Sequence, residues 1–107
     1  MKWTAVNPAT EEVLREYPGV DLAGAEAIVE AAAKAQSEWR RTGFAHRSEL
    51  MRRAGAILRE RSDEFAELMT LEMGKPLREA RGEVEKCAWV CEYYAEHAEG
   101  QLPGGPA

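Results

Sequence analysis

Cys87 and Cys91 carry the most reactive side chains of the 107-residue chain and lie four positions apart in a segment with helical spacing. A structural zinc site needs about four ligands, and the two histidines, His46 and His97, have no zinc-finger spacing. Both cysteines fall on an apolar helix stripe that offers no base or positive charge to activate a thiolate. The pattern predicts unbridged, packed thiols.

The other candidates for chemistry favour ordinary structural roles. His46 falls in the first turn of an expected helix and His97 near the end of another, and we expect both at the surface. Gly104 and Gly105 form the only glycine pair, without the flanking strand and helix of a phosphate-binding loop.

Arginines are frequent between residues 40 and 61, but acidic residues interleave with them. The pairs Glu49–Arg53 and Glu30–Lys34 have the i,i+4 spacing of helix ion pairs, so a solvated mixed-charge face is expected. The net charge of −5 argues against a nucleic-acid partner. No apolar stretch has the length of a membrane span or a secretory signal, and two cysteines make no disulfide framework. We therefore expect a cytoplasmic protein without a membrane partner.

Two short N-terminal segments, residues 2–6 and 13–17, have strand character. Asn7 and Pro8 between them suit a turn, because proline presets φ and asparagine can bond its own backbone. We expect a β-hairpin that leans on another element, since an isolated hairpin is marginal in water.

Three longer regions have the apolar spacing of helices. The first covers about residues 22–40, with Asp21 as N-cap and Gly43 beyond its end. The second covers about 45–73 and the third about 77–99. The first helix carries a stripe that we expect to be buried: Ala25, Ile28, Val29, Ala32, Ala35 and Trp39.

The boundaries within and after the second region are marked by residue type. Ser62 and the two acidic residues after it look like a cap and first turn, which would divide the region into two helices. Gly74 suits a left-handed C-terminal position, Lys75 the negative helix end, and Pro76 the start of the next helix.

The expected fold is mainly α, an N-terminal β-hairpin followed by three to four helices. Residues 1–99 would form this unit, and residues 100–107 a coil tail. The third region carries a wide apolar stripe formed by Ala80, Val84, Cys87, Ala88, Cys91, Tyr94, Ala95 and Ala98. Trp89 and Val90 fall off this stripe and indicate a second face for a further partner.

Three groups of residues, taken in order, resemble the N-terminal part of the aldehyde dehydrogenase superfamily. They are the hairpin motif Val-Asn-Pro-Ala-Thr-Glu-Glu-Val at 6–13, then Trp39-Arg40, Phe44-Ala45 and Arg47, then Leu-Glu-Met-Gly-Lys-Pro at 71–76. The resemblance covers roughly residues 3–99. Residues 72–76, with Ala-Arg-Gly-Glu-Val at 80–84, are most similar to the succinate-semialdehyde dehydrogenase branch.

This resemblance implies a piece of the α/β aldehyde dehydrogenase fold. The family oxidises aldehydes to acids with NAD or NADP, using a cysteine nucleophile and a glutamate that activates water. By resemblance these residues and the cofactor site lie beyond residue 107, and neither Cys87 nor Cys91 matches the catalytic motif. We expect no catalytic or cofactor-binding residue here, and no aldehyde oxidation by the chain alone.

Two sites of the family map onto this chain by resemblance. The carbonyls of Ala5 and Val6 with the carboxylate of Glu72 correspond to a structural monovalent-cation site, and hard cations prefer oxygen ligands. The alternative is that Glu72 is a solvated helix residue. A further set, at the mouth of the family's substrate tunnel, corresponds to Glu83, Lys86 and Val90.

The expected partner is the remainder of the dehydrogenase, or a second copy of this chain contacted through Trp89, Val90, Tyr93 and Tyr94. The alternative is a small helical protein–protein interaction module. Coding sequence after residue 107 with a Gly-Gln-x-Cys-type motif would distinguish the dehydrogenase from the module.

Overall fold

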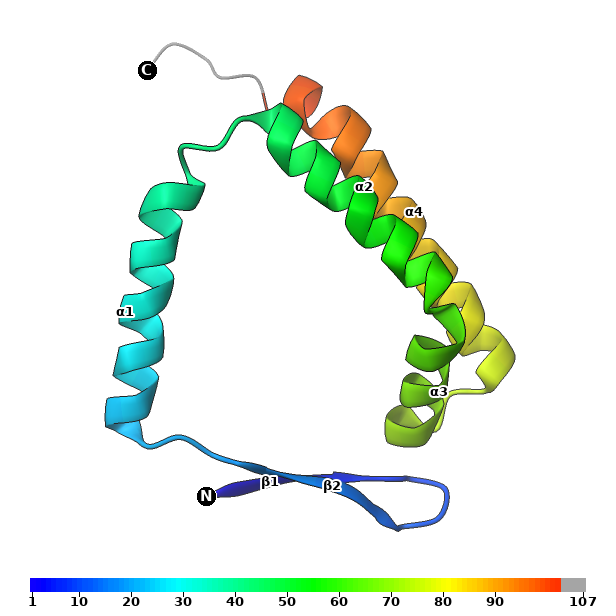
Figure 1. Ribbon diagram of the computed structural model, residues 1–107. Helices are drawn as coiled ribbons and strands as arrows, with labels where there is room; N and C mark the ends of the chain where they lie inside the picture. Colours follow the sequence, from blue (N-terminus) through cyan, green and yellow to red (C-terminus); the bar gives the residue numbers. More distant parts are fainter. Residues whose placement is uncertain (103–107) are drawn as a thin grey trace.

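The computed structural model describes residues 1–102 and shows a β-hairpin followed by four helices (Figure 1). The expected mainly α fold with an N-terminal hairpin is confirmed. Its elements are β1 (Lys2–Val6), β2 (Val13–Pro18), α1 (Leu22–Trp39), α2 (Phe44–Glu60), α3 (Ser62–Met73) and α4 (Leu77–Gln101). Gly100 and Gln101, expected as coil, are the last helical residues, and residues 103–107 of the expected tail lie outside the described residues.

The hairpin forms as the turn chemistry predicts. β1 and β2 pair antiparallel, with Lys2 opposite Pro18 and an irregularity in register between Ala5 and Val6. The Oδ1 of Asn7 accepts a 2.9 Å hydrogen bond from the Ala9 backbone N–H, which stabilises the connection between the strands. Both strands are largely exposed.

The helix ends follow the expected residues with one correction. Asp21 caps α1 by accepting a 2.8 Å hydrogen bond from the Gly24 N–H. Gly74 ends α3 in the left-handed region at φ 71°, and Pro76 immediately precedes α4. Ser62 was expected as a cap, but Arg61 holds that position and Ser62 is the first residue of α3. Residues 45–73 therefore form two helices joined at a single residue.

A small core lies where α4 packs against α2 and α3. Ala66, Ala80 and Val84 are buried there, and Leu58, Phe65 and Met69 pack around them. Further along the α2–α4 contact, Gly55 lies so close to α4 that an added Cβ would stand 3.1 Å from the Ala88 carbonyl oxygen. Gly55 thus lets the two helices approach closely at Ala88.

The stripe of α1 was expected to be buried, and this prediction is wrong within the described residues. Helix α1 has no buried residue, and Ile28 and Val29 are 58% and 67% exposed. The spacing of the stripe is that of an amphipathic helix, but no element of residues 1–102 covers it. Contacts of α1 with α2 are made at its C-terminal end, where Trp39 meets His46 and Arg47.

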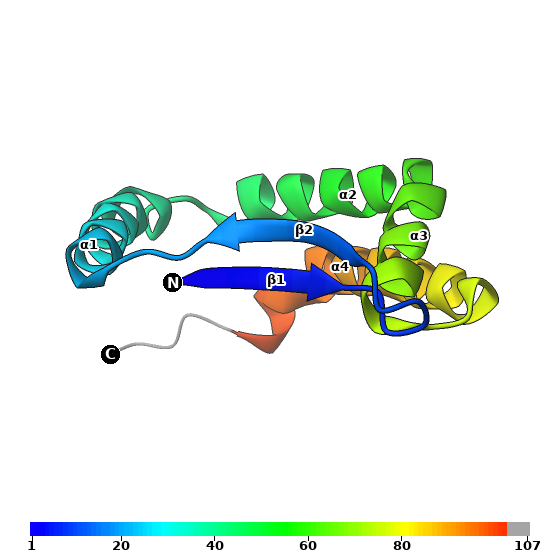
Figure 2. The same cartoon turned by 90° about the horizontal axis from the view of Figure 1, so that it is seen from below.

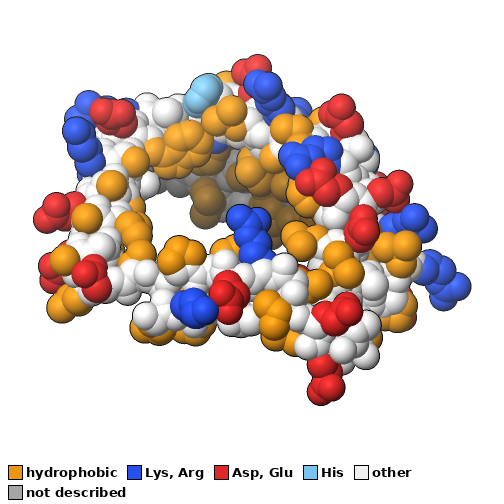
Figure 3. Space-filling model, turned by 60° about the horizontal axis from the view of Figure 1, so that its bottom comes forward, with side chains coloured by type: hydrophobic (Ala, Val, Ile, Leu, Met, Phe, Trp, Pro, Cys, Tyr) orange, Lys and Arg blue, Asp and Glu red, His pale blue; other side chains and the backbone are white. Residues whose placement is uncertain are grey.

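The elements form an open frame, with α1, the hairpin and the α2–α4 pair along three sides (Figures 1 and 2). The radius of gyration is 18.3 Å, against about 13 Å for a compact domain of this length. The surface of 8681 Å² exceeds by about 2,700 Å² that of a compact monomer of the same mass. Apolar side chains border the opening of the frame in the space-filling view (Figure 3).

Candidate functional site

The hairpin turn and the α3–α4 connection meet at one corner of the frame. Helix α3 contacts β1, and a Cβ on Gly74 would stand 3.0 Å from Cγ of Pro8. Glycine is therefore required at position 74 for two reasons. Its positive φ ends α3, and the absence of a Cβ leaves room for the ring of Pro8. This contact brings the end of α3 beside the strand that carries Ala5 and Val6.

The resemblance assigned a cation site to this same corner. The register irregularity between Ala5 and Val6 interrupts the regular ladder, and such bulges leave backbone groups without a strand partner. Glu72 lies exposed on the last turn of α3 and forms no ion pair within residues 1–102. Carbonyl and carboxylate oxygens are the donors that a hard cation prefers, so the chemistry of this set fits the ion.

The residues assigned to the substrate tunnel lie along α4, with different environments. The carboxylate of Glu83 accepts a hydrogen bond from Lys75, and this contact raises the pKa of Lys75 above its ordinary value. Lys86 is exposed without an ion pair in the described part of the chain, and Val90 is half-buried. The uncompensated charge of this set is therefore the ammonium group of Lys86.

Both cysteines are free, but the prediction that both are packed is wrong for Cys87. Cys87 is exposed and Cys91 is half-buried beside Gly55. The apolar stripe of α4 is wider than the surface that α2 and α3 cover, and the buried face centres on Val84 and Ala88. Cys87 lies on the uncovered border of that face.

The aromatic residues of α4 contact one another. The centroid of the Tyr93 ring lies 5.8 Å from the ring centroid of Trp89, 5.2 Å from that of Tyr94 and 4.5 Å from that of His97. Trp89 and Tyr94 remain 56% and 49% exposed. Within residues 1–102, no three His, Cys, Asp or Glu residues are grouped to hold a metal ion.

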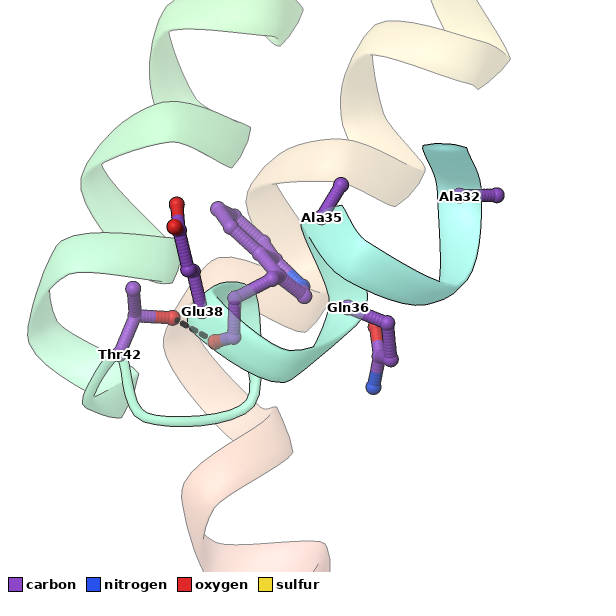
Figure 4. Close-up of a pocket in the computed structure, with 6 residues that line it drawn as sticks. Ala32, Ala35, Gln36, Glu38 and Thr42 are labelled. Atoms are coloured by element: carbon purple, nitrogen blue, oxygen red, sulfur yellow. Dashed lines mark hydrogen bonds between the residues drawn. The ribbon is translucent and has the colours of Figure 1, made fainter. Parts of the chain in front are cut away.

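The elbow between α1 and α2 is built around Arg47, whose role the sequence reasoning missed. Its guanidinium donates to the Trp39 carbonyl and to Oγ1 of Thr42, each at 2.8 Å, and lies over the indole ring of Trp39. Thr42 also donates its hydroxyl to the Trp39 carbonyl at 2.7 Å. Figure 4 shows Thr42 and that bond beside a shallow pocket lined by Ala32, Ala35, Gln36, Glu38, Trp39 and Thr42.

A second missed arginine, Arg59, joins α2 to α4. Its guanidinium donates to Glu85 at 3.0 Å and makes two contacts with Glu92. The hydrogen bond from Arg59 lowers the pKa of Glu92, and the two carboxylates raise the pKa of Arg59. The spacing of seven between Glu85 and Glu92 places both on one helix face, a signal available in the sequence.

None of the helices in residues 1–102 is both long enough and apolar enough to span a membrane. The acidic and basic groups described above lie on an open scaffold, and apolar side chains border most of its opening, into which a basic side chain also projects (Figure 3).

Comparison with known proteins identifies this scaffold. The family model described as the aldehyde dehydrogenase family matches residues 1–104. The chain belongs to the aldehyde dehydrogenase family, and the expected resemblance is confirmed.

The similar proteins point to one branch of that family. A succinate semialdehyde dehydrogenase of Escherichia coli K12 is 41% identical over 102 residues, which are 95% of this chain and 22% of that protein. An NADP-dependent succinate-semialdehyde dehydrogenase of Deinococcus radiodurans is 44% identical over 94 residues, or 88% of this chain and 20% of that protein. The chain thus spans about a fifth of these relatives and is a succinate-semialdehyde dehydrogenase-like fragment of the family fold.

Solved structures agree with the assignment to the aldehyde dehydrogenase family. The succinic semialdehyde dehydrogenase of Streptococcus pyogenes, in complex with NADP+, superposes with a TM-score of 0.88 at 33% identity. That match covers 98% of this chain and 23% of the other. An NAD-dependent benzaldehyde dehydrogenase of Corynebacterium glutamicum gives a TM-score of 0.88 at 30% identity, over all of this chain and 24% of the other. The open frame is therefore the shape that the matching segments have inside these larger enzymes.

Proposed function

We propose that the chain is the N-terminal scaffold of an NAD(P)-dependent dehydrogenase that oxidises a short aldehyde with a carboxylate at its other end, such as succinate semialdehyde. The observation that carries the proposal is the 41% identity, over 95% of the chain, to a succinate semialdehyde dehydrogenase. In this proposal the nucleophile, the base and the dinucleotide site belong to the remaining four-fifths of the enzyme. The proposal also places the enzyme in the cytoplasm, as the sequence predicts.

The role of this chain in that enzyme is to shape and support the substrate entrance. Helix α4 is held against α2 and α3 by the buried core and by Arg59, so its remaining face has a fixed position. On that face Glu83 forms an ion pair with Lys75, whereas Lys86 has no ion pair within residues 1–102. An uncompensated ammonium group favours a substrate with a distal carboxylate over an uncharged aldehyde.

We further propose a structural monovalent cation at the corner between the hairpin and α3, held by the carbonyls of Ala5 and Val6 and the carboxylate of Glu72. When bound, the ion would tie β1 to the end of α3, where Pro8 already contacts Gly74. This ion has a structural role and takes no part in the oxidation.

A chimaeric enzyme tests the proposal. Residues 1–99 of this chain replace the matching segment of the Escherichia coli relative, and NAD(P)+ reduction is followed with succinate semialdehyde and with an uncharged aldehyde of similar length. We expect the chimaera to retain activity and to prefer succinate semialdehyde. Lys86→Gln should then raise KM for succinate semialdehyde while KM for the uncharged aldehyde stays within about twofold. A folded chimaera that oxidises neither aldehyde would contradict the proposal.

A further inference from the structure

Helix α4 is held against α2 by small residues along the part that follows Val84. Within residues 1–102, the buried side chains of this part are Ala88 and Ala95. Helix α2 meets Ala88 with Gly55, which has no side chain. Large side chains fix the rotation of one packed helix against another, because the ridges of each helix fit the grooves of its partner. The small residues here allow a close approach but leave the rotation of α4 weakly determined.

Arg59 supplies this constraint from one turn further along α2. Its Nε donates to Glu85 at 3.0 Å, and its Nη2 donates to Glu92 at 3.1 Å, while Nη1 contacts the same Glu92 carboxylate. The two acidic residues are seven positions apart, so they lie almost in line along α4 at a separation of about 10 Å. A single guanidinium that holds both carboxylates opposes rotation of α4 about its axis and also sliding along it.

The face of α4 with the proposed substrate contacts points away from α2. Lys86 lies about 160° around the helix from both Val84 and Ala88, which are buried. A rotation of α4 by about 20° would carry atoms that lie about 6 Å from the helix axis through about 2 Å. A displacement of about 1 Å at a substrate contact is enough to change a rate strongly. The rotation of α4 therefore decides where the Lys86 ammonium group is placed.

We propose that Arg59 is a positioning residue for substrate selection. By bridging α2 to Glu85 and Glu92, it fixes the rotation of α4 and with it the place of the Lys86 ammonium group at the substrate entrance. In this role Arg59 acts through α4 and needs no contact with the substrate. The link to Lys86 rests on the proposed function, whereas the effect of Arg59 on α4 rests on the contacts of Arg59 alone.

Arg61 provides a matched control two residues further along the chain. Its guanidinium donates to Glu64, three positions away, and lies over the ring of Phe65. Arg59→Gln and Arg61→Gln make the same change in charge. Within residues 1–102, however, only Arg59→Gln removes hydrogen bonds to α4.

Thiol labelling of Cys91 measures the hold on α4 independently of any activity. Cys91 and Glu92 both lie against Gly55, where an added Cβ would stand 3.5 Å from each side chain. In the 107-residue chain with Cys87→Ser, Arg59→Gln should raise the labelling rate of Cys91 about threefold, and Arg61→Gln should change it by less than about 1.5-fold. Circular dichroism checks that the variants keep their helices. An unchanged Cys91 rate in the folded Arg59→Gln variant would overturn the inference.

Kinetics of the chimaeric enzyme test the link to Lys86. Arg59→Gln should raise KM for succinate semialdehyde about fivefold and KM for the uncharged aldehyde by less than about twofold, whereas Arg61→Gln should change each by less than about twofold. Adding Arg59→Gln to Lys86→Gln should change KM by less than about a further twofold, because both substitutions remove the same contact. Arg59→Lys keeps the charge but lacks the planar fork that bridges two carboxylates, so it should resemble Arg59→Gln.

The results separate this inference from the proposed function. A folded chimaera that oxidises neither aldehyde contradicts the proposed function, and the labelling of Cys91 still decides whether Arg59 holds α4. In an active chimaera, three results would overturn the inference alone: no change in KM with Arg59→Gln, an equal rise in KM for both aldehydes, or effects of Arg59→Gln and Lys86→Gln that multiply in the double variant.

Discussion

Replacing Gly55 by alanine should weaken the pairing of α2 and α4. A Cβ at this position would lie 3.1 Å from the Ala88 carbonyl oxygen and 3.5 Å from Cβ of Cys91. The nearest atom belongs to a helix backbone, so relief requires the two helices to move apart. Overpacking of this kind costs about 1–3 kcal/mol, against a gain of about 1 kcal/mol because alanine is the better helix former. The net loss of unfolding free energy is up to about 2 kcal/mol.

Gly82 provides the matched control on α4, because a Cβ there would meet nothing within 4 Å. Gly82→Ala should raise the unfolding free energy by about 1 kcal/mol through helix propensity alone. The same substitution at the two positions should therefore differ by about 1–3 kcal/mol in its effect. Urea unfolding followed by circular dichroism at one fixed protein concentration gives both values. If Gly55→Ala stabilises the chain as much as Gly82→Ala, the close approach of α2 and α4 is refuted.

Three further predictions follow from the contacts between the helices. Because Arg59 lowers the pKa of Glu92, the folded chain binds fewer protons at Glu92 than the unfolded chain near pH 4.5, the ordinary pKa of this group. The unfolding free energy should therefore fall as the pH drops below 4.5, and it should fall less steeply in Arg59→Gln. Acid titration of the circular dichroism signal of the helices measures both. Cys87 should react with a thiol reagent faster than half-buried Cys91, and equal rates in the two single-cysteine variants would argue against the exposed border of α4. Arg47→Ala should speed hydrogen exchange at the C-terminal end of α1 and leave exchange in α4 unchanged, because its two hydrogen bonds close only the elbow.

The parts of the fold that depend on neighbouring residues were predictable from the sequence. The Asn7–Pro8 turn, the Asp21 cap and the Gly74 end of α3 each rest on side-chain or backbone preferences that act over a few positions. The four helices also follow from apolar spacing, including the division of residues 45–73 at Ser62.

The wrong predictions concern which helix faces are buried, and this depends on residues far apart in the sequence. The stripes of α1 and α4 show that these faces need a partner, but spacing alone does not say whether this chain supplies it. Ile28 and Cys87 were therefore expected inside and are exposed. The bonds of Arg59 to Glu85 and Glu92 span 26 and 33 positions, and such distant pairings are fixed only when the helices pack.

The candidate site was found through the order of motifs along the chain. Family membership, and with it the likeness to succinate-semialdehyde dehydrogenases, is established by the match over residues 1–104. The roles of Ala5, Val6, Glu72, Glu83, Lys86 and Val90 remain proposals. The structure shows two features of these residues that the sequence did not indicate. Glu83 forms an ion pair with Lys75, and the strand register is irregular between Ala5 and Val6.

Fragment complementation tests the central claim most directly. The 107-residue chain is mixed with a form of the Escherichia coli relative from which the matching segment has been removed, and NAD(P)+ reduction is measured with succinate semialdehyde. Each piece alone should be inactive, because this chain matches only about a fifth of that relative and the other piece lacks its scaffold. The mixture should gain activity that saturates with added chain, and Gly55→Leu should weaken this gain by disrupting α2 and α4. Activity of the purified 107-residue chain alone, or a truncated relative that is fully active without it, would contradict the account.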